Sequence, residues 1–342
     1  MRWESRARAT AALAGMLVAG CRGDDSPARV TIPAGATMRA AAESLSMGGV
    51  IRFPALFSAY AKARSSDRGI KAGTYVVAKT ASWNSILGAL RGGGEVITVL
   101  VPEGLTLSQI EAVLVAKLGV PADSAAAATR DTALLRRLDV PTGTVEGYLF
   151  PDTYFFPPGT SARTAVATMV RRFEQQWKPE WVFRLDSISM SRHDVMTLAS
   201  IVEREAKRPE ERPIIAAVYM SRLHKGMLLQ ADPTVQYALP QYQKRLLNKH
   251  LLIDSPYNTY RHAGLPPGPI GAPGVASIRA ALYPANVPYL YFVAFPDGHH
   301  EFRVSLEQHQ LAARQARRAW NALKAKQEEE ARKSAAASRP GE

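Results

Sequence analysis

Two glutamates at the end of a predicted helix are the first candidates for chemistry. Glu203 and Glu205 follow an apolar helical face that consists of Val195, Leu198, Ala199, Val202 and Ala206. On a helical wheel Glu203 lies at one border of this face and Glu205 at the other. A carboxyl group that apolar neighbours partly desolvate has a raised pKa, which suits a general acid. A solvated helix end would explain both glutamates equally well, and spacing alone does not choose between them.

Other catalytic patterns are missing from the sequence. It contains no HExxH pattern, no Cys/His metal-ligand spacing and no GxSxG nucleophile elbow. The triple glycine at 92–94 lacks the Lys-Ser/Thr pair of a phosphate-binding loop. We therefore expect no metal ion and no other cofactor.

Six aromatic residues lie in segments without helical or strand periodicity, namely Tyr148, Phe150, Tyr154, Phe155, Tyr257 and Tyr260. Gln230, Asp232, Asn258 and Thr259 are in comparable segments. Rings next to such polar groups suit a sugar, which offers apolar CH faces and a rim of hydroxyls. Packing in small satellite cores is the equally weighted alternative for the rings.

The charge of the chain favours an anionic partner. Its 342 residues carry a formal net charge of +13, with 46% hydrophobic and 21% charged residues. These fractions are typical of a globular protein, and the charge suits nucleic acid, anionic lipid or an anionic wall polymer. No arginine-rich arm, RNP-like strand or Cys/His finger is present, so we do not expect nucleic acid. A solvated basic surface is the simpler alternative.

The N-terminus is typical of a signal or membrane-anchor segment. Arginines precede an apolar run at 9–20, which is too short for a stop-transfer helix. The run ends in "LVAGC", and Cys21 is the only cysteine. This pattern favours lipidation of Cys21 over an uncleaved anchor or ordinary secretion. We therefore expect residues 1–21 to tether the chain to a membrane, with the remainder outside the cytoplasm.

The rest of the sequence predicts an α+β protein with two domains. After a linker at 22–29, residues 30–101 form a small α+β module. "VTIPAGATMRAAAESL" and "VLVPEGLTLSQIEAVL" both predict a strand, a Pro-x-Gly-x-Thr turn and a helix. Thr37 and Thr106 are the expected N-caps, and Thr106 with Gln109 fits a capping box.

The second domain, at 102–310, is predicted to be mixed α+β with loops that line a cleft. Helices are expected at 106–117, 131–137, 162–176 and 275–282, and from Ser191 and Pro209 onward. The segment "VEGYLFPDTYFFPPGT" and the long Pro/Gly-rich stretch from "QADPTVQYAL" to "GAPG" are expected to be irregular. Residues 311–342 are a charged tail, helical to about 326 and then disordered.

Five ordered blocks resemble the YceG-like endolytic murein transglycosylase family. They are "EGYLFPDTY", "LASIVEREA", "ER…AAVYMSRL…GMLLQADPTVQYAL", "SPYNTYRHAGLPPGPI" and "ALYPANVPYLYFVAFPDGHHEF". With the "KAGTY" strand, the resemblance covers residues 30 to about 310. It implies that 30–101 is a LysM-like module that binds N-acetylglucosamine-containing glycan, and that 102–310 is the catalytic domain.

The resemblance also implies a reaction and a site. The family's catalytic glutamate falls on Glu203, which would act as acid and then base to leave a 1,6-anhydro end. Residues that match blocks around the family's cleft are assigned to substrate binding: Gln230, Asp232, Thr234, Tyr257, Asn258 and Thr259.

Partners and location follow from the same resemblance. It implies action on nascent, uncrosslinked peptidoglycan at the outer face of the inner membrane, together with penicillin-binding proteins. The short leader departs from the family's usual transmembrane helix, and a lipidated Cys21 would also allow the outer membrane. Two rival functions remain: a muramidase-type hydrolase with Asp232 or Asp152 as second carboxylate, and a non-catalytic glycan-binding scaffold.

Overall fold

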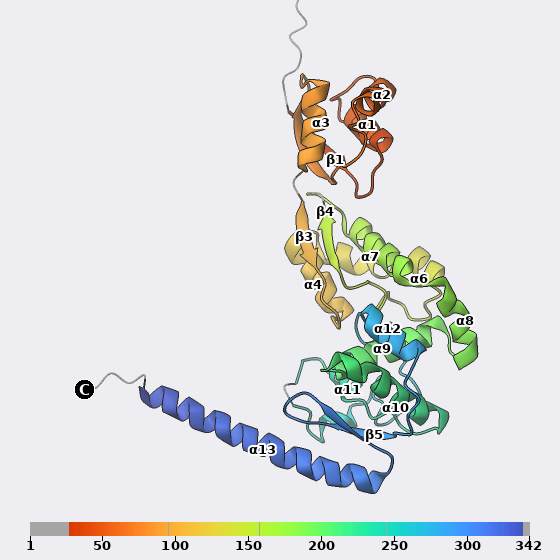
Figure 1. Ribbon diagram of the computed structural model, residues 1–342, viewed down its shortest axis with the longest axis vertical. Helices are drawn as coiled ribbons and strands as arrows, with labels where there is room; N and C mark the ends of the chain where they lie inside the picture. The colour runs from red at the N-terminus through yellow and green to blue at the C-terminus, as the bar shows by residue number, and fades with distance from the viewer. Residues whose placement is uncertain (1–26, 95, 157, 244, 338–342) are drawn as a thin grey trace, which may run out of the picture. The chain divides into compact units, whose positions relative to one another are not determined.

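The computed structural model describes residues 27–337 except 95, 157 and 244 (Figure 1). The predicted leader, Cys21 and residues 22–26 of the linker lie outside these described residues, whereas 27–29 already belong to the first strand. Within the described ranges, no helix has both the length and the apolar character that crossing a membrane requires. The chain divides into two compact units, one of residues 1–97 with 155–158 and the other of 98–154 with 159–342.

The smaller unit combines a two-stranded antiparallel sheet with three helices (Figure 1). Its elements are β1 (Pro27–Ile32), α1 (Met38–Met47), α2 (Pro54–Ala63), β2 (Gly73–Ala78) and α3 (Trp83–Gly92). In β1, buried Ala28, Val30 and Ile32 alternate with exposed Arg29 and Thr31. This period of two turns one face of the strand into the core, where it meets the buried residues of the helices.

Two further strands, β3 (Ile97–Leu100) and β4 (Thr153–Phe156), pair with each other. The expectation that "VEGYLFPDTYFFPPGT" is irregular throughout was therefore wrong. Tyr154 and Phe156 are buried, whereas Thr153 and Phe155 are exposed. This alternation is the signal of a strand, which the flanking Gly and Pro residues obscured.

The larger unit is mainly helical. It contains α4 (Leu107–Leu118), α5 (Ala122–Ala128), α6 (Thr132–Leu138), α7 (Ala162–Gln176), α8 (Pro179–Ile188), α9 (Arg192–Glu205), η1 (Pro209–Glu211), α10 (Arg212–His224), α11 (Asp232–Ala238), η2 (His250–Leu252), α12 (Val275–Leu282), β5 (Tyr291–Ala294), β6 (His300–Arg303) and α13 (Leu306–Ala337). The capping box expected at Thr106 and Gln109 is formed, and so is one at Ser191 and Asp194. Strands β5 and β6 form an antiparallel hairpin.

Helix α9 is the central helix of this unit. Residues 195–202 are buried without exception, because α10, α11 and α12 all pack against α9. The single apolar face that the wheel predicted is therefore too narrow, since Thr197 and Ser200 are buried as well. Both hydroxyls donate to carbonyl oxygens of their own helix, at 2.8 and 2.7 Å.

Two predicted irregular segments contain helix. Helix α11 begins at Asp232 inside the Pro/Gly-rich stretch, where Pro233 occupies a first-turn position that does not need its missing N–H group. Residues 327–337, expected to be disordered, continue α13. Three i,i+4 ion pairs join its exposed side chains: Lys324–Glu328, Lys326–Glu330 and Glu329–Lys333.

Candidate active site

A cavity of about 300 Å³ lies at the C-terminal end of α9. Its lining comes from α9, α10, α11, β5, β6, α13 and the connecting loops. The lining residues are Glu205, Tyr219, Arg222, Leu229, Gln230, Asp232, Tyr260, Phe292, Val293, Ala294, His300 and His309. Glu205 and two of the predicted substrate-binding residues, Gln230 and Asp232, therefore share one cavity.

Glu205 has the environment of a general acid. The buried Tyr219 hydroxyl donates a hydrogen bond of 2.8 Å to its Oε1. Burial raises the pKa of Glu205 to about 7, and the nearby charge of Asp232 adds to the rise. The Tyr219 bond and Lys207 oppose it more weakly. A carboxyl with this pKa exchanges a proton readily near neutral pH.

Tyr219 remains a proton donor to Glu205. Burial and the adjacent Glu205 charge raise the pKa of the Tyr219 phenol well above its usual value. The Tyr219 ring is also held edge-on against Phe292, with 5.7 Å between ring centroids. One oxygen of Glu205 is thereby fixed, which leaves Oε2 as the oxygen that can exchange a proton with a bound molecule.

Gln230, Asp232 and Tyr260 form a polar wall of the cavity. The Tyr260 hydroxyl donates to Asp232 Oδ1 at 2.5 Å. Gln230 has a left-handed backbone with φ of 52°, which is uncommon for a residue with a side chain. Its N–H donates to the Thr259 carbonyl at 3.0 Å, so the backbone is fixed while the side chain stays exposed.

Thr234, Asn258 and Thr259 support this wall from behind. All three are buried, and none of them is among the residues that line the cavity. The Thr259 hydroxyl accepts from the Ala231 N–H at 3.0 Å and shares a hydrogen bond of 2.9 Å with Thr234. Asn258 donates to the carbonyls of Leu251 and Ile253, both at 2.9 Å. These residues bond within the protein, and their assignment to substrate binding stays a prediction.

Tyr257 also lies away from the cavity. Its ring packs on Tyr237, with 4.8 Å between centroids, and the Tyr237 hydroxyl donates to Glu146 Oε2 at 3.1 Å. The two Glu146 oxygens also accept from the Leu107 N–H, each at 3.0 Å. Burial raises the pKa of Glu146 to about 7. This cluster connects α4 to α11, whose N-terminal residue is Asp232.

Glu203 is held by a different set of partners. Its Oε1 accepts from Arg212 at 3.0 Å and its Oε2 accepts from the Gly274 N–H at 3.0 Å. Gly274 is the N-cap of α12, so the carboxylate lies where the helix dipole favours negative charge. The Glu203 side chain is only 6% exposed and does not line the cavity that contains Glu205. Glu203 therefore does not share the cavity of Gln230 and Asp232.

The comparisons with known proteins identify the family. The sequence model of the YceG-like family matches residues 30–315. The chain belongs to the YceG-like family. A Bacillus subtilis protein named endolytic murein transglycosylase is 35% identical over 303 residues, which cover 83% of each chain.

Two further matches to the YceG-like chain have a lower sequence identity. A Streptococcus pneumoniae protein, also named endolytic murein transglycosylase, is 30% identical over 298 residues, which cover 78% of this chain and 54% of that protein. The crystal structure of a YceG-like protein from Listeria monocytogenes is similar with a TM-score of 0.59 and 32% identity. That match covers 84% of this chain and 99% of the Listeria chain. The predicted family and the mixed α+β fold class are therefore confirmed.

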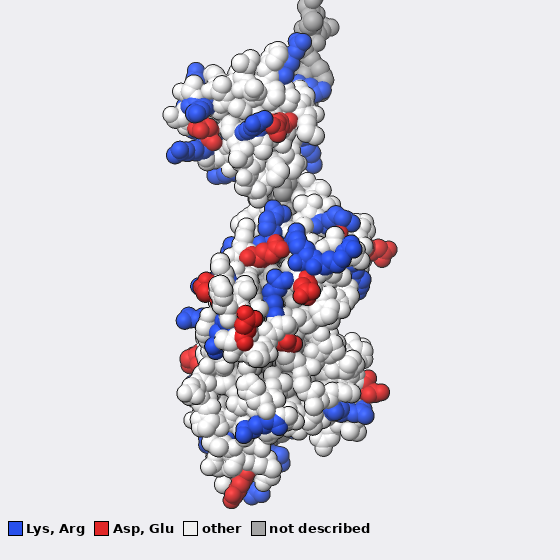
Figure 2. Space-filling view, turned by 90° about the vertical axis from the view of Figure 1, so that its right-hand side faces the viewer, with Lys and Arg blue, Asp and Glu red and all other residues white. Residues whose placement is uncertain are grey.

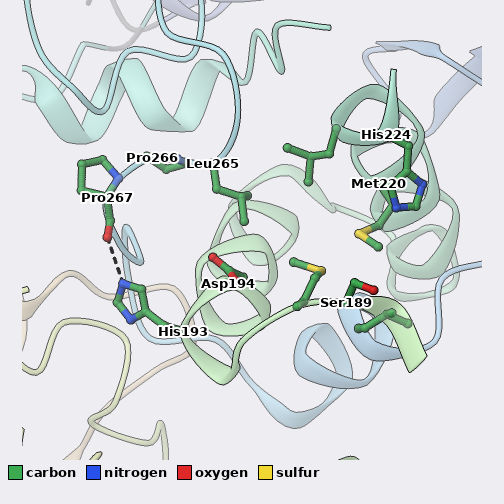
Figure 3. Close-up of a pocket in the computed structure, with 11 residues that line it drawn as sticks. Ser189, His193, Asp194, Met220, His224, Leu265, Pro266 and Pro267 are labelled. Atoms are coloured by element: carbon green, nitrogen blue, oxygen red, sulfur yellow. Dashed lines mark hydrogen bonds between the residues drawn. The ribbon is translucent and has the colours of Figure 1, made fainter. Parts of the chain in front are cut away.

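A second cavity of the YceG-like chain, of about 410 Å³, contains His193 and Asp194 from the first turn of α9 (Figure 3). The His193 Nε2 atom lies 2.9 Å from the Pro267 carbonyl, which only accepts, so Nε2 carries the proton. Its Nδ1 then accepts from the Tyr148 hydroxyl at 3.1 Å. Both ring nitrogens hold the loop in place, and no predicted site residue lies in this cavity.

Several expectations about single residues are decided by burial. Tyr148, Phe150 and Tyr154 are core residues, so the sugar interpretation does not apply to them. Asp152 is paired with Arg172 at 2.7 Å and does not line the cavity of Glu205. Sequence reasoning missed Tyr219, Arg222 and His309, because each is far from Glu205 in sequence and belongs to an ordinary-looking helix. Tyr260 was among the aromatic candidates, two positions from Asn258.

Proposed function

We propose that the chain is an endolytic murein transglycosylase that cleaves the bond between N-acetylmuramic acid and N-acetylglucosamine. The substrate is the nascent, uncrosslinked glycan strand, and the product carries a 1,6-anhydro end. The observation that carries the proposal is a glutamate, Glu205, that lines one cavity together with Gln230, Asp232 and Tyr260, and whose pKa burial raises. Membership in the YceG-like family and the names of the relatives support it.

We assign the acid and base roles to Glu205 in place of Glu203. A catalytic carboxyl must exchange its proton with the substrate, and Glu205 Oε2 is available for this at the cavity. Glu203 instead uses both oxygens to hold Arg212 and the start of α12.

The reaction starts with protonated Glu205. It transfers its proton to the glycosidic oxygen as the bond to C1 of the muramoyl residue breaks, and positive charge develops at C1 and the ring oxygen. The Glu205 carboxylate then accepts the proton of the C6 hydroxyl, whose oxygen forms a bond to C1. Glu205 returns to its starting state and no water is consumed. One carboxyl group therefore performs both proton transfers.

The remaining cavity residues orient the sugar. Gln230 offers an amide donor and acceptor from a fixed backbone, and Asp232 is held in place by Tyr260. The positions of these groups are supported from behind the wall by hydrogen bonds of Thr234, Asn258 and Thr259. Tyr257 contributes through Tyr237 and the cluster around Glu146.

Asp232 gives one rival function a specific basis. Because it lines the same cavity as Glu205, it is placed to activate water or to attack C1, as a muramidase-type hydrolase would require. The product distinguishes this mechanism, since hydrolysis leaves a reducing end in place of an anhydro end.

The decisive test is mass spectrometry of uncrosslinked glycan strands after incubation with residues 22–342. We expect internal cuts with anhydromuramic ends, which Glu205→Gln abolishes while it folds normally. Glu203→Gln is the matched control, in which the loss of activity follows the loss of folded protein, because Arg212 loses the nearer of its two acidic partners, Glu203 and Glu103. If Glu203→Gln were fully folded but inactive while Glu205→Gln stayed active, the general acid and base would be Glu203.

Other outcomes of the same experiment identify the rivals. Hydrated ends that Asp232→Asn also abolishes would establish a hydrolase. Intact strands that the parent protein binds but does not cut would favour a non-catalytic glycan-binding scaffold.

The smaller unit and the N-terminus bear on substrate binding and on the location of the enzyme in the cell. We assign residues 30–101, which include most of the smaller unit from β1 to α3, to glycan binding as a LysM-like module, and we propose that the enzyme acts in the cell envelope outside the cytoplasm. Residues 1–21 supply the membrane anchor, through lipidated Cys21 or as an uncleaved segment. Penicillin-binding protein synthases are the proposed partners, since they produce the uncrosslinked strand.

A further inference from the structure

His309 lies in the wall of the Glu205 cavity. Its Nδ1 is buried and unpaired, and it is the one such side-chain nitrogen or oxygen in the part of the chain that the structure describes. A buried polar group without a partner is destabilising, so its presence needs an explanation. His193 shows the contrast, since both of its ring nitrogens have partners.

The surroundings hold the His309 ring in a fixed plane. It stacks on Tyr291, with 5.4 Å between centroids and 24° between planes. The Arg222 guanidinium lies 5.2 Å from the centre of the same Tyr291 ring. Burial, with help from the Arg222 charge, lowers the pKa of His309. The neutral imidazole that results has one donor and one acceptor nitrogen, which matches a hydroxyl or an acetamido group.

Helix α13 brings His309 to this position. Ala312 and Ala316, one and two turns further along, are only 2% exposed, because this side of the helix packs on β5 and β6. The Trp320 Nε1–H donates to the Ala294 carbonyl at 3.1 Å, and Ala294 lines the same cavity. The first half of α13 is thus held against β5, the strand that forms one wall of the site.

We propose that His309 is a substrate-binding residue, whose imidazole hydrogen-bonds a hydroxyl or acetamido group of the N-acetylated sugar next to Glu205. The inference rests on the proposed function, which supplies the sugar. It adds α13 to the elements that complete the site, and it explains why an unpaired nitrogen is retained there. When a sugar is bound, His309 acquires the partner that it lacks in the free protein.

The test compares His309→Phe, His309→Gln and His224→Phe in the full-length protein. Phenylalanine keeps a ring on Tyr291 but removes both nitrogens, whereas glutamine restores an amide donor and acceptor. His224 lies exposed at the end of α10 and outside the cavity, so it is the matched control. We expect His309→Phe to lower kcat/KM about tenfold through a higher KM, with partial recovery in His309→Gln and no change in His224→Phe.

A binding measurement separates this inference from the proposed function. The ¹⁵N signals of the His309 ring are followed in Glu205→Gln protein during titration with the tetramer of N-acetylglucosamine, and we expect a shift that His224 does not share. An unshifted His309 signal together with parent-like kinetics of His309→Phe would overturn the inference while cleavage stands. A shifted signal in a protein whose parent cuts no strand would leave His309 as a sugar ligand and overturn the proposed reaction instead.

Discussion

At the scale of single residues, Glu203 and Glu205 show how much a two-position difference matters on a buried helix. Glu203 is hydrogen-bonded to Arg212 and to the Gly274 N–H at the start of α12, whereas Glu205 is desolvated beside Tyr219 and Asp232. The same side chain therefore bonds to protein groups with both oxygens at one position and is our candidate acid at the other. Two predictions concern Glu205 and its neighbouring contact with Tyr219.

Removing the Tyr219 hydroxyl should raise the pKa of Glu205 further. The bond from Tyr219 favours the charged carboxylate and is one of the forces that lower this pKa. In Tyr219→Phe the acid form therefore persists to higher pH, and the alkaline limb of the pH profile of kcat should move up by about one pH unit. A profile that stays in place, or moves down, would mean that Tyr219 does not act through Glu205.

Glu205 should also make stability depend on pH. Its pKa is raised from 4.5 to about 7 in the folded protein, so between these values the folded chain keeps a proton that the unfolded chain has lost. The free energy of unfolding therefore falls as pH rises through this window. Glu205→Gln removes the effect and should gain about 2–3 kcal/mol over the parent between pH 5 and pH 8.

Urea unfolding of both proteins at pH 5 and pH 8 measures this gain. It is the change in the free energy of unfolding between the two pH values in Glu205→Gln minus the same change in the parent. The Glu146 carboxyl, whose pKa is also raised to about 7, leaves a residual slope in both proteins and does not obscure the comparison. Parallel pH dependences for parent and variant would show that Glu205 is not desolvated as the structure indicates.

At the scale of secondary structure, local signals in the sequence were sufficient for most elements. Capping residues predicted the starts of α4 and α9, and Gly226, with φ of 65°, follows the end of α10. Helix α11 was missed because it is short and has a proline in its first turn, and β4 because Gly and Pro flank it. Such elements form through tertiary contacts more than through their own propensity.

The candidate site was only partly predictable for a related reason. Gln230 and Asp232 were found from their block, but the direction of each side chain at the end of α9 depends on which helices surround it. Arg204 illustrates this, since it donates to the Gly104 carbonyl at 3.2 Å on yet another side of the helix. A helical wheel identifies a single apolar face, whereas α9 packs against α10, α11 and α12 on different sides.

Asn258 tests whether the loop behind the cavity wall is held as described. Its amide binds the Leu251 and Ile253 carbonyls, and its oxygen accepts from the Tyr260 N–H at 3.0 Å. Asn258→Ala should lower the free energy of unfolding by about 2–4 kcal/mol, because buried backbone groups lose their partners. The exposed Asn248 is the matched control, and its alanine variant should change stability by less than about 0.5 kcal/mol. Equal stability of the two variants would contradict this structural role and would favour the predicted direct contact of Asn258 with the sugar.

At the scale of the whole molecule, the positive charge is spread out and the apolar exposure is more informative. Figure 2 shows Lys and Arg interspersed with Asp and Glu over both units, in place of one basic patch on the face in view. The net charge of +13 therefore describes a generally basic surface more than a specific anion site. In the smaller unit, Met47, Phe53 and Leu56 are exposed by 91, 52 and 59% at the end of α1 and the start of α2.

These apolar side chains are the natural contact for the CH faces of a sugar polymer. If the smaller unit binds glycan, its affinity and that of the Glu205 cavity combine when both engage one long strand, because the second contact is made within the same chain. Phe53→Ser with Leu56→Ser should then lower retention on insoluble N-acetylglucosamine polymer at least about tenfold, while kcat on short strands is unchanged. The matched control is Val182→Ser with Phe183→Ser, which removes exposed apolar groups from α8 of the larger unit, 53 and 78% exposed. Equal retention of the two double variants would exclude this face as a glycan contact and would remove the support for a LysM-like role.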